Sequence, residues 1–245
     1  MTSGDPRPRF SLVVPVYNEE ANVAALLQEV AEVLLPHGPL EVVAVDDGST
    51  DGSHQRMVDW KREHAATWLR IVRLQRNGGQ SSAVLAGVEQ ARAPIVTTMD
   101  GDMQNDPRDL PRMVAEVESG RVDAVVGVRR KRMDTFVRRA SSRIGNAVRN
   151  AVTGDRVQDA ACGIKVVRRE FFLAAPRFHG MHRFMATLVR QLGGKVVETD
   201  VNHRPRAAGV AKYGIGNRAL RGLRDCFGVR WLGMRTIRPL VRDEV

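Results

Sequence analysis

Short apolar runs alternate with amphipathic or polar stretches through the first half of the chain, and this alternation restricts its fold more than any other feature. The apolar runs predict strands over residues 10–16, 40–45, 69–74, 94–99 and 124–128. The stretches between them predict helices over residues 23–34, 53–64, 80–92 and 107–118. Fully apolar strands that alternate with helices are typical of a parallel sheet covered on both faces. We therefore predict an α/β fold.

The second half of the chain is less regular. It predicts an arginine-rich, partly amphipathic helix over 133–153, a strand over 163–167, a helix over 181–193 and a strand over 195–201. Beyond these, helical spacing places five apolar residues on one stripe with arginines off it: Ile215, Ala219, Leu223, Phe227 and Trp231. Such a stripe suits a bilayer interface, the protein's own core or a membrane-spanning partner, and the sequence leaves all three open. We predict one domain over residues 1–214 and a basic amphipathic extension over 215–245.

Charge is distributed unevenly along the 245 residues, whose net charge is +10. Residues 129–150 carry eight Lys/Arg against one acid, and residues 203–245 carry ten against three. A basic second half predicts an anionic partner, which is a phosphate compound, an acidic bilayer surface or nucleic acid; a merely soluble arginine-rich surface is the alternative. Only 5% of the residues are aromatic, and the basic segments do not interleave them, which disfavours nucleic acid.

The compartment is indicated by what the sequence does not contain. Its first ten residues have no apolar export core, and no apolar run reaches the roughly 20 residues that span a bilayer. Two cysteines, Cys162 and Cys226, form no disulfide framework and fit a reducing compartment. We expect a cytoplasmic protein in which Cys162 packs as a small apolar group.

Polar clusters follow three of the predicted strands, at residues 17–19, 46–49 and 100–104. In parallel sheets, ligands bind beyond the carboxyl ends of the strands. Asp100 and Asp102 repel each other unless a cation or a ligand offsets their charge, and Gly101 lets the backbone turn between them. Hard oxygen ligands on an open turn suit Mg²⁺ or Mn²⁺. The cluster therefore predicts a metal site, with a solvated turn as the alternative.

Four ordered segments carry a resemblance to a known family: VVPVYNEE (13–20), VDDGSTDGS (45–53), RNGGQSSAVLAG (76–87) and MDGDMQNDP (99–107). Together they resemble glycosyltransferase family 2, in its branch of dolichol-phosphate mannose synthases and polyprenyl-phosphate glycosyltransferases. The similarity continues in residues 159–172, 180–184 and 201–214, so it covers residues 10–232. The resemblance implies a GT-A fold, with a Rossmann-like, mostly parallel sheet flanked by helices. It also implies an inverting transfer from a nucleotide-sugar donor.

The resemblance also implies roles for individual residues. The donor would lie against Pro15, Tyr17, Glu19, Asp47, Asn77, Gln80, Asp100 and Gly101, with Asp47 accepting a hydrogen bond from the base. The divalent ion, Mg²⁺ or Mn²⁺, would be held on the donor diphosphate by Asp100, Asp102 and Gln104. The acceptor phosphate would meet Arg129, Arg139 and Ser142. The residues expected to serve catalysis are Asp102, Arg139, Asp159, Arg206 and Lys212.

Two positions depart from the family pattern. Ala211 replaces the usual serine before Lys212, which removes one hydrogen bond to phosphate. Asp159 is followed by Ala-Ala-Cys rather than the commoner Thr-Gly-Cys, which alters the backbone beside the acceptor. Neither change removes a charge, and Arg206 and Lys212 remain to close over the diphosphate.

The nucleophile decides which further groups the reaction needs. A phosphate monoester is largely dianionic at pH 7, so it needs orientation and charge compensation, which arginine supplies. A sugar hydroxyl would need a general base, for which Asp159 is the best candidate, with a turn or cap acid as its alternative role. His182 and His203 are expected to be local hydrogen-bond anchors.

We therefore predict transfer of mannose or a similar hexose from a GDP- or UDP-linked donor to a polyprenyl phosphate of the dolichyl or undecaprenyl type. The protein would act peripherally at the cytoplasmic face of a membrane, on its surface or beside an integral-membrane partner. One alternative is transfer to a hydroxyl of a soluble or polymeric sugar. A nucleic-acid-binding protein and a non-catalytic relative are more remote alternatives.

Overall fold

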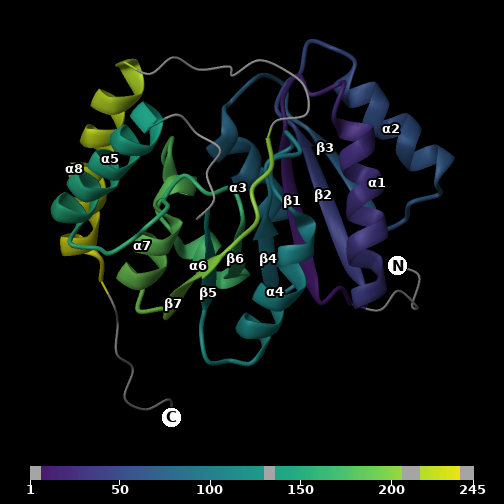
Figure 1. Ribbon diagram of the computed structural model, residues 1–245. Helices are drawn as coiled ribbons and strands as arrows, with labels where there is room; N and C mark the ends of the chain where they lie inside the picture. The colour runs from purple at the N-terminus through teal and green to yellow at the C-terminus, as the bar shows by residue number, and fades with distance from the viewer. Residues whose placement is uncertain (1–6, 130–135, 206–215, 238–245) are drawn as a thin grey trace.

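A seven-stranded sheet runs through the part of the chain that the computed structural model describes, residues 7–129, 136–205 and 216–237 (Figure 1). The strand order is β3-β2-β1-β4-β6-β5-β7. The strands are β1 (Phe10–Val16), β2 (Leu40–Asp46), β3 (Leu69–Arg73), β4 (Ile95–Thr98), β5 (Ala124–Val128), β6 (Lys165–Arg168) and β7 (Val196–Asp200). Only β6 runs antiparallel to its neighbours, β4 and β5. The mostly parallel sheet is confirmed, with β6 as the exception to the fully parallel pattern.

The helices follow the predicted alternation in the first half. They are α1 (Val23–Leu34), α2 (Ser53–Glu63), α3 (Gln80–Gln90), α4 (Leu110–Glu118), α5 (Phe136–Thr153), α6 (Arg169–Ala174), α7 (Met185–Gln191) and α8 (Gly216–Arg235). Short 3₁₀ turns, η1 (Leu35–His37), η2 (Pro107–Asp109) and η3 (Met181–Arg183), follow α1 and precede α4 and α7. The single helices expected over 107–118 and 181–193 are thus each a 3₁₀ turn followed by an α-helix. The short helix α6 was not predicted.

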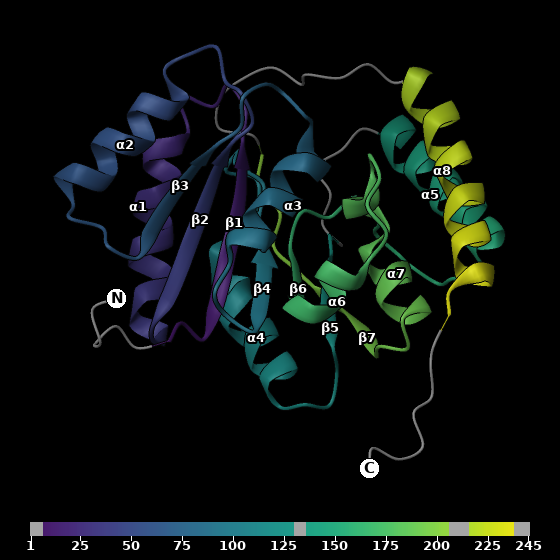
Figure 2. The same ribbon diagram turned by 180° about the vertical axis from the view of Figure 1, so that it is seen from behind.

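Two apolar cores sandwich the sheet. One core combines the sheet with α1, α2 and α4, and the other combines it with α3, α6 and α7, which face the viewer in Figure 2. The spacing of apolar residues explains the first core, because α1 buries residues three and four positions apart: Val23, Leu26, Leu27, Val30 and Leu34. Strands buried on both faces are the reason that the sequence shows continuous apolar runs.

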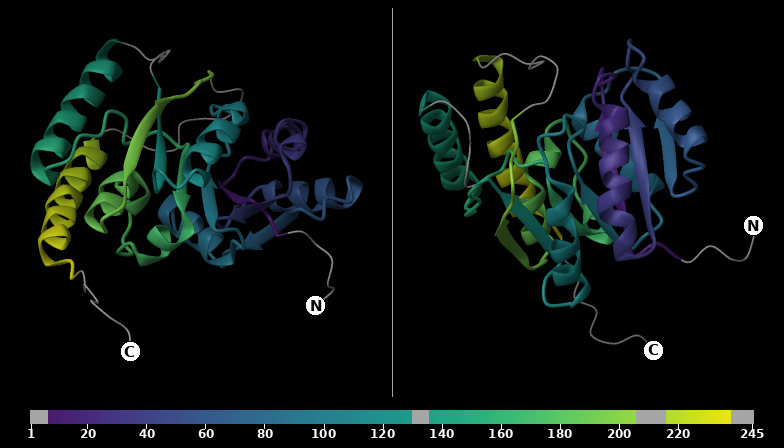
Figure 3. Two further views of the ribbon diagram at one scale, coloured as in Figure 1. Left: turned by 90° about the horizontal axis from the view of Figure 1, so that it is seen from below. Right: turned by 45° about the vertical axis from the view of Figure 1, so that its right-hand side comes forward.

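The helices α5 and α8 pack against each other at the β7 end of the sheet (Figure 3). α8 buries Cys226 and Val229, whereas the described members of the predicted stripe, Leu223, Phe227 and Trp231, remain exposed. Of the three alternatives left open by the sequence, docking on the protein's own core is thus not seen for these three residues. A different face of α8 packs against α7. At Gly233 a Cβ atom would lie 2.7 Å from Cδ of Gln191.

The predicted C-terminal extension is only partly described. The domain boundary expected between residues 214 and 215 lies outside the described residues, as does Ile215. Along the described segments, no helix combines the length and the apolar character needed to cross a bilayer.

Candidate active site

A cleft of about 480 Å³ opens at the carboxyl ends of β1, β2 and β4. Its size falls within the roughly 300–1,000 Å³ of small-molecule sites. Eight residues predicted from the sequence line it: Pro15, Tyr17, Glu19, Asp47, Gln80, Asp100, Gly101 and Asp102. The rest of the lining includes residues 160–163, Lys165, His182 and Arg183. The parallel strands thus bring the three polar clusters of the first half to one edge, as predicted.

Asp47 is held at the β2 end of the cleft by backbone groups. Its Oδ1 accepts a hydrogen bond from the Gly78 N–H at 2.8 Å. Burial raises the pKa of Asp47, and the hydrogen bonds from Gly78 and Gly79 offset only part of that effect. The adjacent Gly48 has φ +68°, and a Cβ there would lie 2.6 Å from the Asn77 backbone nitrogen. The sequence thus needs glycine at this turn. Asn77 itself is not among the residues that line the cleft.

The loops after β1 and β2 are bound to each other beside Asp47. The Asn18 N–H donates to Ser49 Oγ at 3.0 Å, and the Thr50 N–H donates to Asn18 Oδ1 at 2.8 Å. Asn18 adopts a left-handed conformation with φ 51°, which asparagine tolerates better than most residues. These contacts fix the position of Tyr17 and Glu19 relative to Asp47.

Asp100 and Asp102 occupy the turn after β4 and both line the cleft. Asp100 Oδ1 accepts a hydrogen bond from Gln80 Nε2 at 2.7 Å, and Asp102 Oδ1 accepts one from the Gln104 N–H at 3.2 Å. Burial and the charge of Asp102 raise the pKa of Asp100. Glycine is required at Gly163, because a Cβ there would overlap the Asp100 carboxylate. Two crowded carboxylates with hard oxygens fit a divalent cation, which would relieve their repulsion.

The third predicted metal ligand, Gln104, is placed differently. It follows Met103, whose φ of 63° is a strained conformation for a side chain of that size. Its Nε2 donates to the Arg204 carbonyl at 3.3 Å, and Gln104 is not among the cleft-lining residues. Within the described segments, no group of three His, Cys, Asp or Glu could hold a metal ion. A bound Mg²⁺ or Mn²⁺ would therefore rest chiefly on Asp100 and Asp102 and would neutralise charge on a diphosphate.

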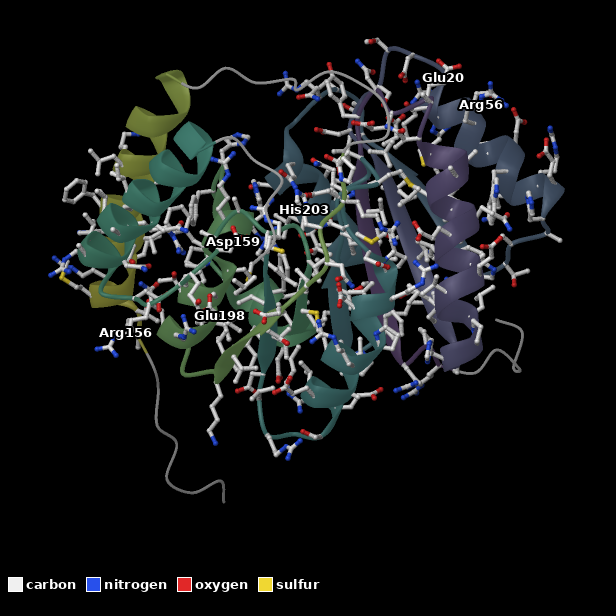
Figure 4. The ribbon with its side chains drawn as sticks, in the orientation of Figure 1. Glu20, Arg56, Arg156, Asp159, Glu198 and His203 are labelled. Carbon is white, nitrogen blue, oxygen red and sulfur yellow. The ribbon has the colours of Figure 1, made fainter. Side chains whose placement is uncertain are left out.

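Arg129 and Asp159 do not line the cleft themselves but form a buried ion pair next to residues 160–163 of its lining (Asp159 is labelled in Figure 4). Arg129 Nε donates to Asp159 Oδ2 at 2.7 Å, and Nη2 donates to Oδ1 at 2.9 Å. Burial disfavours the Arg129 charge, but the hydrogen bond and charge of Asp159 outweigh it and raise the pKa of Arg129. Both oxygens of Asp159, which is 5% exposed, are thus engaged by a guanidinium. Asp159 is therefore held in place as the counterion of Arg129.

Lys165 lines the cleft but was missed by the sequence reasoning. It begins β6 and is only 6% exposed, and its Nζ donates to the Cys162 carbonyl. Burial lowers the pKa of Lys165, and the charges of Cys162, Asp100 and Asp159 oppose this effect. A lone lysine between Ile164 and Val166, in an apolar strand, was the available signal. Cys162 packs in the core as expected.

His182 reaches the cleft from η3. Its Nδ1 lies 2.6 Å from Ser81 Oγ, and the same hydroxyl accepts the Gly180 N–H at 2.9 Å. His182 is therefore a hydrogen-bond anchor, as expected, and it ties η3 to the first turn of α3. Its place in the cleft wall beside Arg183 was not predicted.

Four predicted residues are not described in enough detail to test. Arg139 and Ser142 lie on α5, but their side chains are outside the described set. Arg206 and Lys212 lie outside the described residues altogether. Their roles stay predictions.

The charged groups of the site fall into two sets. The carboxylate side comprises Asp47, Asp100 and Asp102. The cation side comprises Arg129, its partner Asp159, and Lys165. A polar cleft whose lining includes both crowded acids and the buried cation Lys165 is suited to holding a polyanionic substrate, through a divalent ion and through nitrogen donors.

The fold and this cleft together define a GT-A glycosyltransferase architecture. The profile described as glycosyl transferase family 2 matches residues 11–174, and the chain belongs to that family.

Curated relatives lie within the same family. A dodecaprenyl-phosphate galacturonate synthase from Rhizobium johnstonii is 39% identical over 236 residues, which cover 94% of this chain and 69% of the relative. An undecaprenyl-phosphate 4-deoxy-4-formamido-L-arabinose transferase from Serratia proteamaculans is 34% identical over 216 residues, covering 88% of this chain and 66% of the relative. The chain thus spans about two thirds of the length of these relatives.

Solved structures share the fold at lower sequence identity. A mannosyltransferase from Pyrobaculum calidifontis, in complex with GDP-Man and Mn²⁺, matches with a TM-score of 0.66 and 24% identity, covering 95% of this chain and 66% of that one. Glucosyl-3-phosphoglycerate synthase from Mycobacterium tuberculosis matches with a TM-score of 0.71 and 19% identity, covering 91% and 81%. These likenesses concern the fold.

Proposed function

We propose that this chain transfers a sugar from a nucleotide-sugar donor to a polyprenyl phosphate. One observation carries the proposal: a single cleft joins the crowded carboxylates of Asp100 and Asp102 to a wall that includes the buried cation Lys165. The relatives named for polyprenyl-phosphate substrates support the choice of acceptor.

The carboxylate side serves the donor in this proposal. Asp47 accepts a hydrogen bond from the base, while Pro15, Tyr17 and Glu19 border the nucleoside, and Asn77, Gln80 and Gly101 complete the donor site. Asp100 and Asp102 hold Mg²⁺ or Mn²⁺ on the diphosphate, and Gln104 would join them only by giving up its hydrogen bond to the Arg204 carbonyl. Neighbouring solved structures in complex with Mn²⁺ or Mg²⁺ support a divalent ion.

The acceptor is held on the other side by Arg129, Arg139 and Ser142, and Arg206 and Lys212 close over the departing diphosphate. A phosphate oxygen attacks the anomeric carbon directly. A single displacement of this kind inverts the configuration there, and it needs no general base because the attacking phosphate is already charged. The engagement of Asp159 by Arg129 supports this route over attack by a sugar hydroxyl.

The donor is proposed to carry guanine or uracil as its base and mannose or a similar hexose as its sugar. The relatives are named for galacturonate and for a modified arabinose, so the donor must be found by a panel. Thermal unfolding with Mn²⁺ and GDP-, UDP- or dTDP-sugars will reveal the donor as the compound that raises the unfolding temperature.

The decisive experiment combines the selected donor, Mg²⁺ and a short polyprenyl phosphate. We expect a lipid-linked sugar whose anomeric configuration, read by NMR, is opposite to that of the donor. If no donor yields a lipid product, and a sugar acceptor with a free hydroxyl is glycosylated instead, the polyprenyl assignment is wrong. Retained configuration would reject the single displacement.

We also propose that the α5–α8 pair rests on the cytoplasmic surface of a membrane. Phe227 and Trp231 are 58% and 56% exposed, and Ile144 and Met234 are also exposed. Exposed arginines, among them Arg224, lie near these apolar side chains along α8. Apolar residues flanked by arginines suit a bilayer interface with acidic headgroups. An integral-membrane partner is the competing occupant of this face.

Co-sedimentation with vesicles of pure lipid distinguishes a bilayer from a protein partner, because such vesicles contain no protein to which the chain could bind. We expect the chain to sediment with phosphatidylglycerol vesicles but not with phosphatidylcholine vesicles. A Phe227→Ser/Trp231→Ser variant should remain in solution in both cases. If the wild-type chain does not sediment with phosphatidylglycerol vesicles, the bilayer is excluded as the occupant and a protein partner is favoured.

A further inference from the structure

Lys165 is a buried cation in the cleft wall to which none of the roles above is assigned. An ammonium carries three N–H donors, and among the described residues one of them is bound, to the Cys162 carbonyl. The side chain is 6% exposed and lines the cleft. Burying an ammonium is costly unless its charge and donors are satisfied. The remaining donors are therefore available to an anion in the cleft.

The sheet places Lys165 between the two sides of the site. In the strand register Lys165 lies opposite Thr98 of β4 on one side and Val126 of β5 on the other. Asp100 and Asp102 follow the end of β4, and Arg129 follows the end of β5. Lys165 thus lies where a donor held on the carboxylate side would meet an acceptor held near Arg129.

The carboxylates around Lys165 are already engaged. Both oxygens of Asp159 accept hydrogen bonds from Arg129. Asp100 accepts a hydrogen bond from Gln80, and it belongs to the proposed metal site. A hydroxyl nucleophile would need a base at this junction, whereas a phosphate nucleophile would need a cation. The junction offers the cation.

We propose that Lys165 is a catalytic residue that binds the acceptor phosphate and makes the site select a phosphate-terminated acceptor over a hydroxyl. This proposal rests on the proposed function above. In the step, an acceptor phosphate oxygen forms a bond to the anomeric carbon, and the bond from that carbon to the donor diphosphate oxygen breaks. The electron pair leaves with the nucleoside diphosphate. The dianionic acceptor becomes a monoanionic diester, the diphosphate gains the negative charge, and no proton moves.

The test measures acceptor binding apart from turnover. Farnesyl phosphate is titrated by calorimetry into protein saturated with Mn²⁺ and the nucleoside diphosphate that the wild type binds. Lys165→Met and Lys165→Gln should weaken farnesyl phosphate binding by about tenfold to a hundredfold, as expected for a lost hydrogen bond to a charged group. Binding of the nucleotide with Mn²⁺ should be unchanged. Lys195→Met removes an equal charge from an exposed position and should leave both affinities unchanged.

The two variants separate charge from structure. Lys165→Gln can still donate to the Cys162 carbonyl, so a role confined to that contact predicts wild-type farnesyl phosphate binding for this variant. Lys165→Met should unfold at the wild-type temperature or above, because replacing a buried charge with an apolar side chain is often neutral or stabilising. Kinetically, the loss should appear as a higher KM for polyprenyl phosphate together with a lower kcat.

Several outcomes would overturn the proposal. Wild-type farnesyl phosphate affinity in Lys165→Gln would show that the charge is not used. Loss of nucleotide–Mn²⁺ binding with unchanged acceptor affinity would assign Lys165 to the carboxylate side instead. Failure of the wild type to make a lipid-linked sugar refutes the proposed function by itself, before any variant is compared.

Discussion

The two sides of the cleft hold their charged groups by different means. On the carboxylate side, Asp47 is bound by backbone N–H groups and Asp100 by the Gln80 amide. On the cation side, Arg129 is bound by the side chain of Asp159, which lies 30 residues away in the sequence. Gly78 lies 31 residues from Asp47, so both contacts join distant segments. They differ because a backbone N–H holds its position through the loop geometry, whereas a guanidinium–carboxylate pair depends on two side chains. The carboxylate side is therefore expected to depend on turn geometry, and the cation side on complementary charge.

The largest expected effect is the loss of stability when the buried pair on the cation side is broken. Arg129→Met leaves the Asp159 carboxylate buried without its guanidinium. Breaking such a pair costs about 3–5 kcal/mol. Urea denaturation followed by circular dichroism measures the change. Adding Asp159→Asn should recover a large part of the loss, since it removes the unpaired charge. If Arg129→Met alone were as stable as the wild type, the proposed difference between the two sides would be wrong.

Loss of an acid on the carboxylate side should instead affect turnover rather than stability. Asp102→Asn is expected to lower kcat by about a hundredfold or more, because charge stabilisation on the leaving diphosphate is lost. Its unfolding temperature in the absence of metal should be equal to the wild type or higher, because the charge that raises the pKa of Asp100 has been removed. Kinetic assays and thermal unfolding provide the two measurements.

Asp59→Asn is the charge-matched control for Asp102→Asn, since it removes an acid from the surface of α2. Its activity should equal that of the wild type. If Asp102→Asn retained full activity and its dependence on Mg²⁺, the assignment of the carboxylate side to the metal would be wrong.

A smaller effect is expected where the carboxylate side depends on turn geometry. Gly48→Ala places a side chain at φ +68° and against the Asn77 backbone. The strained conformation and the overlap should together cost about 2 kcal/mol. Gly145→Ala is the matched control, because its site on α5 is open and alanine favours a helix by about 1 kcal/mol. Gly48→Ala should lower the urea midpoint and Gly145→Ala should raise it. If both substitutions changed the midpoint in the same direction, the geometric argument would be contradicted.

The smallest effect concerns an ion-pair bridge from Arg204, after β7, to α1 and to the loop after β4. Arg204 donates to Glu29 at 2.9 Å and pairs with Asp106 at 2.8 Å. Burial would raise the pKa of Asp106, but hydrogen bonds from the Arg108 N–H and from Arg204 outweigh it and lower that pKa. The stabilisation by the Asp106 carboxylate is therefore present above its unfolded pKa of about 3.9 and is lost as pH falls through the lower folded value.

Removing Arg204 should let the folded pKa of Asp106 move upward. Arg204→Ala is thus expected to shift the acid unfolding transition to higher pH, while stability at pH 7 falls by less than about 1 kcal/mol because the arginine is partly exposed. An acid titration followed by circular dichroism tests this shift. An unchanged acid midpoint would mean that the Arg108 N–H alone sets the pKa.

Sequence reasoning was most successful on the carboxylate side. The strands and helices of the first half were predicted with small errors at their ends, and Asp47, Asp100 and Asp102 do meet in one cleft. Their positions follow from local pattern, because parallel strands bring their carboxyl ends to one edge whatever the details of packing. The family resemblance placed Asn77 and Gln104 in the site, although neither is among the residues that line the cleft.

The sequence by itself determined the α/β alternation, the polar edge of the sheet and the excess of positive charge in the second half, because each of these depends on residues close together in the chain. Only the tertiary structure decided that β6 runs antiparallel, that Asp159 is bound by Arg129, and which face of α8 is buried. Those features arise from contacts between distant segments. The burial of Lys165 between β4 and β5 was decided in the same way, by a strand order that no local pattern encodes.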